Sequence, residues 1–197
     1  MNNPAPNRKI FLDCGAHNGC SVRKFNQYFP DFEVYSFDPN PYLCHHFIGL
    51  NTHHYPVAVW TSTKKIPFYI DEYDYDGSSV YKHKKNIVGG KEIQTDAIDF
   101  DAFIRKNFSP SDFIILKLDI EGAEYPVLTK LLETKTINYI DELLIEWHYK
   151  KINLPEEDHN LLVQKLKAQN IPMHKWDAIT SYQDDINYLR KKYKTSL

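Results

Sequence analysis

A carboxylate and an imidazole stand two residues apart at the end of an apolar run, as Glu146 and His148 in LLIEWH. Side chains two apart on a β-strand point to the same face. Asp119 follows a second apolar run, FIILKL, and adds another carboxylate if the two runs are neighbouring strands. Such a group can take a proton from a hydroxyl or hold a cation that helps the hydroxyl to ionise. These three residues are the candidate reaction centre.

Two further acids, Glu121 and Glu124, flank a glycine where a helix is expected to start. Negative charge is favourable at a helix N-terminus, and for Glu124 we expect only that role. Glu121, closer to Asp119, is a candidate catalytic residue. Two mechanisms stay open: a divalent cation (Mg or Mn) bound by Asp119, Glu146 and His148, or His148 as a general base oriented by Glu146. A purely structural pairing of Glu146 with His148 is the alternative.

A second group of residues lies near the N-terminus, in the loop DCGAHNG. Gly15 and Gly19 allow a tight turn and a close approach of the next helix. A dinucleotide fingerprint requires a further glycine where this chain has His17, so a ligand without pyrophosphate fits better. Asp38 ends the next apolar run, where an acid can accept hydrogen bonds from ribose hydroxyls. S-adenosylmethionine meets these conditions, and its positive charges suit Asp13. The alternative is a tight turn with a helix cap.

The order of apolar runs and amphipathic segments predicts an α/β fold with a parallel sheet covered by helices on both faces. We expect strands at 9–13, 33–37, 54–59, 113–118, 139–147, 173–176 and 186–190, and helices at 21–29, 42–50, 99–107, 123–132 and 156–169. Segment 61–95 is expected to be an inserted hairpin region, with strands at 66–70 and 80–82. Ligands of such sheets bind at the carboxyl ends of the strands, where the acids above are found.

Composition and charge exclude several classes of protein. A chain of 197 residues predicts a single domain over 1–197. The 24 basic and 26 acidic residues give a net charge of -2, so no nucleic acid partner is expected. No apolar run is long enough for a membrane span, and the N-terminus lacks a secretory signal. Three cysteines without metal or disulfide spacing favour a cytoplasmic location.

The blocks FLDCGAHNG, VYSFDPNP, LKLDIEGAEYPVL and LLIEWH, between about residues 10 and 148, resemble those of the FkbM-type methyltransferases. These form a branch of the class I, Rossmann-like S-adenosylmethionine-dependent fold. The resemblance implies a doubly wound, mixed seven-stranded sheet with an antiparallel last strand. The family more often carries Glu where Asp38 stands. The resemblance also implies a set of cofactor-binding residues. That set comprises Asp13, Gly15, Ala16, His17, Gly19, Asp38, Asn40 and Ala58.

The expected function is therefore that of an S-adenosylmethionine-dependent O-methyltransferase. By the resemblance, the acceptor is a sugar hydroxyl of a glycan or glycosylated small molecule, with segment 61–95 near the acceptor site. One alternative is a nicotinamide-dependent oxidoreductase, which His17 in the glycine loop disfavours. The other is a catalytically silent cofactor-binding module. The sequence carries no signal of oligomeric state.

Overall fold

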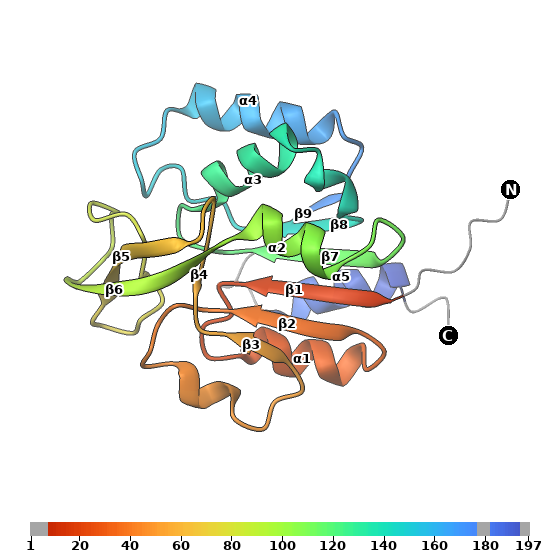
Figure 1. Ribbon diagram of the computed structural model, residues 1–197, viewed down its shortest axis with the longest axis horizontal. Coiled ribbons are helices and arrows are strands. Elements are labelled where there is room, and N and C mark those ends of the chain that lie inside the picture. Colours follow the sequence, from red (N-terminus) through yellow and green to blue (C-terminus); the bar gives the residue numbers. More distant parts are fainter. Residues whose placement is uncertain (1–7, 177–181, 194–197) are drawn as a thin grey trace, which may run out of the picture.

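The main sheet has six parallel strands in the part of the chain that the computed structural model describes, residues 8–176 and 182–193 (Figure 1). Their order across the sheet is β3 (His53–Tyr55), β2 (Glu33–Phe37), β1 (Lys9–Cys14), β7 (Phe113–Leu118), β8 (Glu142–Ile145) and β9 (Met173–Lys175). The strand order reverses between β1 and β7. Ligands of doubly wound sheets bind beyond the strand ends at such a reversal.

Helices cover both faces of this sheet (Figure 1). One face carries α1 (Cys20–Tyr28) and α5 (Tyr182–Tyr193), and the other carries α2 (Phe100–Asn107), α3 (Glu124–Glu133) and α4 (Glu156–Lys167). Successive strand residues point to opposite faces, so β7 must be apolar on both. Its Ile114 and Leu116 accordingly pack in the core under α2, α3 and α4, while Ile115 packs under α1 and α5.

A smaller three-stranded sheet has the order β4 (Ala58–Trp60), β6 (Gly89–Asp99), β5 (Lys64–Asp71). Strands β5 and β6 form the predicted antiparallel hairpin. The second strand of this hairpin is β6, whereas residues 80–82 were predicted. Residues 80–82 form no strand, and the neighbouring Ser79 makes only an isolated bridge to Tyr69. The predicted strand at 54–59 is divided between the two sheets as β3 and β4. Pro56 stands at the break, where its missing N–H could not serve a strand.

Two predicted elements near the ends of the sheet differ from the structure. Residues 186–190 were expected to form a closing strand, but they belong to α5. The apolar residues Ile186 and Leu189 are three apart, a helical spacing that was wrongly assigned to a strand. The described sheet is thus six-stranded and all parallel. The predicted helix at 42–50 is only the 3₁₀ turn η1 (Cys44–Phe47), while a second turn, η2 (Thr136–Tyr139), precedes β8.

The α/β, Rossmann-like fold class is confirmed. No helix in the described ranges combines the length and apolarity that a bilayer crossing requires. Residues 1–7, where no secretory signal was expected, lie outside the described residues.

Candidate active site

The glycine loop after β1 is built against the end of β7. Gly15 has a φ of +79°, and a Cβ atom added to it would lie 1.7 Å from the carbonyl oxygen of Asp119. Only glycine allows both this backbone conformation and this close approach. The backbone N–H groups of Gly15 and Ala16 donate to the carbonyl oxygen of Phe37, at 2.9 and 3.1 Å. The ends of β1, β2 and β7 are thereby fixed next to one another.

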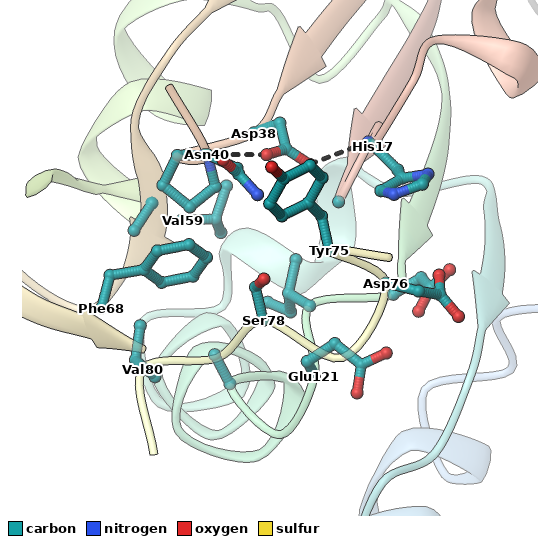
Figure 2. Close-up of a pocket in the computed structure, with 16 residues that line it drawn as sticks. His17, Asp38, Asn40, Val59, Phe68, Tyr75, Asp76, Ser78, Val80 and Glu121 are labelled. Carbon is teal, nitrogen blue, oxygen red and sulfur yellow. Dashed lines mark hydrogen bonds between the residues drawn. The ribbon is translucent and has the colours of Figure 1, made fainter. Parts of the chain in front are cut away.

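Asp38, directly after β2, is held by backbone donors. Its Oδ2 accepts from the N–H of His17 at 2.8 Å, and its Oδ1 accepts from the N–H of Asn40 at 2.9 Å (Figure 2). Burial raises the pKa of Asp38 to about 6, although these two hydrogen bonds oppose the rise. Two nearby buried atoms, Asn40 Nδ2 and His17 Nε2, have no hydrogen-bond partner among the described residues. Both are donors or acceptors that a ligand can satisfy.

A hollow of about 640 Å³, open mouth included, joins this loop to the candidate reaction centre. Figure 2 shows side chains from the glycine loop, the end of β2, the small sheet and the end of β7 around it. The lining comprises Gly15, His17, Asp38, Pro39, Asn40, Ala58, Val59, Phe68, Tyr75, Asp76, Ser78, Val80, Asp119, Ile120, Glu121 and Ala123. Seven of the residues singled out from the sequence are among them: Gly15, His17, Asp38, Asn40, Ala58, Asp119 and Glu121.

The other five, Asp13, Ala16, Gly19, Glu146 and His148, do not belong to the lining. Asp13 is fully buried behind the loop, where Ser21 Oγ donates to it at 2.5 Å and Lys117 Nζ lies 3.0 Å away. Lys117 also donates to the carbonyl oxygen of Gly15 at 2.7 Å. The geometry therefore makes Asp13 a support of the loop and disfavours the expectation that it lines the cofactor. The supporting role of Lys117 was missed, although a charged residue inside FIILKL signals it.

At the ends of β7 and β8, four carboxylates surround one imidazole. His148 Nε2 lies 3.2 Å from Glu121, 3.4 Å from Glu146 and 3.9 Å from Asp119. His148 Nδ1 lies 3.0 Å from Glu124 Oε1. The structure thus brings together all four candidate catalytic residues, and it adds Glu124.

Glu124 does more than the sequence interpretation assigned to it. As expected at a helix start, it accepts the backbone N–H groups of Ile120 and Gly122, both at 2.9 Å. It is fully buried and also holds His148 Nδ1, so Glu124, rather than Glu146, orients the imidazole. The D-x-E-G-x-E spacing places Glu124 where both contacts are possible.

The packed charges shift the protonation of the centre. Burial lowers the pKa of His148, but the carboxylates of Glu124, Glu121 and Glu146 outweigh burial and raise the pKa to about 12. Burial raises the pKa of Asp119 to about 7, with the charges of Glu146 and Glu121 adding to the rise. When no metal ion is bound among them, these acids keep the imidazole protonated. A protonated imidazole has no lone pair with which to act as a base.

The connection between β5 and β6 contributes a buried lysine to this centre. Lys84 Nζ lies 2.7 Å from Glu121 Oε2 and donates to Gly77 O at 3.0 Å and Asn86 Oδ1 at 2.9 Å. Ser79 Oγ donates to the carbonyl oxygen of Glu121 at 2.7 Å. Burial raises the pKa of Glu121, but the close contact with the His148 imidazole and the charge of Lys84 lower it to about 2. Sequence reasoning missed Lys84, which stands among other lysines in YKHKK.

One subset of the centre has the composition of a metal site. Asp119, Glu146 and His148 each offer a ligand atom, and these atoms lie within 4.8 Å of one another. His148 Nε2 is buried and makes ion-pair contacts, none of which has hydrogen-bond geometry. The two carboxylates suit Mg²⁺ or Mn²⁺, and the imidazole favours a transition metal such as Mn²⁺ over Mg²⁺.

The sequence model of the methyltransferase FkbM domain matches residues 13–171. The chain belongs to the FkbM methyltransferase family. The matched range begins at the glycine loop and ends just before β9. It therefore includes every residue that lines the hollow of this FkbM methyltransferase. Membership implies S-adenosylmethionine as methyl donor and rejects the nicotinamide oxidoreductase alternative. No curated protein and no solved structure matched the chain.

Proposed function

We propose that this FkbM methyltransferase transfers a methyl group from S-adenosylmethionine to a sugar hydroxyl of a glycan or a glycosylated small molecule. One observation carries the proposal: a single hollow is lined both by Asp38 and Asn40 and by Asp119 and Glu121. Methyl transfer requires the sulfonium methyl and the acceptor oxygen to lie in line within one enclosed site. A hollow lined by both groups of side chains suits that arrangement.

The cofactor half offers groups that fit the ligand. Asp38 keeps lone pairs free for ribose hydroxyls beyond its two backbone hydrogen bonds. Asn40 Nδ2 and His17 Nε2 supply unsatisfied polar atoms beside it. Ala58 and Val59 add an apolar wall suited to adenine. We assign cofactor binding to these five residues and to the backbone of Gly15.

The acceptor half is assigned to the carboxylate centre. In this proposal Asp119, Glu146 and His148 hold a divalent cation, which when bound lowers the pKa of the acceptor hydroxyl and fixes its position. Glu124 holds the Nδ1–H of His148 and so points Nε2 toward the two carboxylates, the usual support for a metal-binding histidine. If transfer runs without a cation, Asp119 is the carboxylate of the hollow placed to accept the hydroxyl proton. His148 as the base is disfavoured by its carboxylate neighbours.

The small sheet completes the proposed acceptor site. Tyr75, Ser78 and Val80, from the connection between β5 and β6, also line the hollow. We assign them to acceptor contacts within one domain spanning residues 1–197. The three cysteines are free, which supports the expected cytoplasmic location.

Two experiments test this function. S-adenosylhomocysteine should raise the melting temperature, whereas NAD should not, because only a ligand of the native state stabilises it. A sugar and glycan panel with methyl-labelled S-adenosylmethionine should give a labelled sugar. No labelled sugar despite S-adenosylhomocysteine binding would contradict the acceptor assignment and favour a silent module.

Metal removal tests the cation assignment. After treatment with EDTA and gel filtration, transfer should fall at least about 100-fold and return with Mn²⁺ or Mg²⁺. S-adenosylhomocysteine binding should be unchanged, since Asp38 and Asn40 do not belong to the cation site. Full activity after EDTA would reject the cation.

A further inference from the structure

Two loops meet beside the carboxylate centre. The N–H of Lys85, in the connection between β5 and β6, donates to the carbonyl oxygen of Lys151, in the connection between β8 and α4, at 2.8 Å. A Cβ atom on Gly122 would lie 2.6 Å from Ile152 and 3.0 Å from Tyr81, so both loops pack on the residue after Glu121. In Figure 1 these connections lie on the same side of the molecule. The loops form one continuous edge of the centre.

This edge is rich in lysine. The first loop contributes the run YKHKK at residues 81–85, and the second contributes YKK at residues 149–151, with no acidic residue in either run. Lys82, Lys85 and Lys150 are exposed, and the Lys151 side chain is 38% exposed. We call these four residues the lysine rim: Lys82, Lys85, Lys150 and Lys151.

In the described part of the chain, three of the four rim lysines form no ion pair with the carboxylates of the centre. The buried Lys84 is matched by Glu121 at 2.7 Å. Lys151 stands between centre and rim, with Nζ 3.8 Å from Glu121 and 4.0 Å from Glu146.

Lys82, Lys85 and Lys150 have no carboxylate within ion-pair distance in the described ranges. The whole chain has a net charge of -2, so this excess of positive charge is local.

We propose that the acceptor is a phosphorylated sugar, either a sugar phosphate or a nucleotide-linked sugar, whose phosphate binds the lysine rim while its hydroxyl enters the carboxylate centre. The inference rests on the proposed sugar methylation. A phosphate carries up to two negative charges and three acceptor oxygens, which several ammonium groups can share. Lys151 links the two sites, since its ammonium group lies close to both Glu121 and Glu146. A phosphate bound by the exposed lysines would lie outside the carboxylate centre, where the negative charges of Glu121 and Glu146 would repel it.

The test uses inorganic pyrophosphate, a probe that is independent of sugar identity. Titrated by calorimetry into wild-type protein saturated with S-adenosylhomocysteine, pyrophosphate should bind. In K82Q/K85Q/K150Q its Kd should rise at least about tenfold. A matched control, K106Q/K165Q/K167Q, removes the same charge from exposed lysines of α2 and α4 and should leave the Kd unchanged. Absence of binding, or equal Kd values in both triple variants, would overturn the proposal.

Paired sugars then identify the source of the phosphate. Glucose, glucose 1-phosphate, glucose 6-phosphate, UDP-glucose and glucuronic acid are compared as ligands and as methyl acceptors. A preference for the ester or the nucleotide form identifies which phosphate the rim binds, and a preference for glucuronic acid or glucose contradicts the inference. Methylation of neutral sugars without pyrophosphate binding overturns the proposal that the lysine rim binds phosphate, but it leaves the proposed sugar methylation intact. Rim-dependent pyrophosphate binding without any sugar methylation overturns the proposed function instead.

Discussion

The two halves of the hollow are built by different means. In the cofactor half, backbone N–H groups do most of the positioning: those of His17 and Asn40 hold Asp38, and that of Gly15 holds the end of β2. In the acceptor half, side chains hold side chains, with His148 among four carboxylates and Lys84 against Glu121. Any residue with a backbone N–H can make these contacts, whatever its side chain. The charged centre depends on particular side chains from several segments, and its parts should therefore fail together.

A large effect on folding should come from Lys84→Met, which removes the nearest positive charge that faces Glu121. A buried carboxylate without its nearest countercharge costs about 3 kcal/mol in free energy of unfolding. Urea denaturation of Lys84→Met should show that loss. The double variant K84M/E121Q should recover much of it, because no unpaired charge remains.

Lys85→Met is the matched control, since Lys85 is exposed and its contact with the second loop is made by its backbone. Its stability should stay within about 0.5 kcal/mol of the wild type. A Lys84→Met variant as stable as Lys85→Met would show that side-chain charge does not hold the acceptor half together.

The cofactor half should instead be sensitive to backbone change, and two glycines test this. Gly15 and Gly49 have nearly the same φ, +79° and +78°. A Cβ atom added to Gly15 would clash with the carbonyl oxygen of Asp119, whereas a Cβ atom added to Gly49 would have no neighbour within 4 Å. Gly49→Ala should cost about 1 kcal/mol for the left-handed backbone alone. Gly15→Ala should cost about 3 kcal/mol and should weaken S-adenosylhomocysteine binding. Equal losses in thermal unfolding would show that the contact with β7 is unimportant.

A smaller effect should appear in the pH dependence of cofactor binding. Asp38 has a pKa raised to about 6, and only its ionised form accepts hydrogen bonds from both ribose hydroxyls. The Kd for S-adenosylhomocysteine should be flat above pH 6 and rise about tenfold per pH unit below it. Asp38→Asn should bind more weakly and lose this dependence in calorimetry. A wild-type Kd that is flat from pH 5 to pH 8 would contradict the assignment.

The same shift has a defined sign for the ligand-free protein. Because folding raises the pKa of Asp38 above its usual value, the native state holds its proton more tightly than the unfolded state. The contribution of Asp38 to stability therefore falls as pH rises from about 4 to about 6 and is constant above that range.

The sequence predicted the cofactor half better than the acceptor half, for the physical reason seen in the contacts. Gly15 and Asp38 belong to local patterns, a glycine turn and an acid at a strand end, and the structure places both on the hollow. Asp13 belongs to the same pattern but is turned inward, because Lys117 from another strand pairs with it. A pattern along one segment does not show which buried charge a distant strand supplies.

In the acceptor half, the sequence predicted that Asp119, Glu146 and His148 lie together, because parallel strands end at one edge. It did not predict that Glu124 orients His148 or that Lys84 neutralises Glu121. Both contacts depend on how loops pack after the strands are placed. The fold shows a similar division: five of the predicted strands lie wholly in the main sheet and 54–59 lies partly in it, but residues 186–190 belong to α5.

The central claim is that one hollow holds the methyl donor on one side and the acceptor hydroxyl at Asp119 on the other. Asp119→Asn keeps the size of the side chain but removes its charge, and it tests this claim when cofactor binding and methyl transfer are measured on the same sample. The Kd for S-adenosylhomocysteine should stay within about twofold of the wild type, while transfer to the sugar panel falls at least about 100-fold. The wild-type product should be a base-stable methyl ether. Wild-type turnover in Asp119→Asn, or a base-labile methyl ester as product, would contradict it.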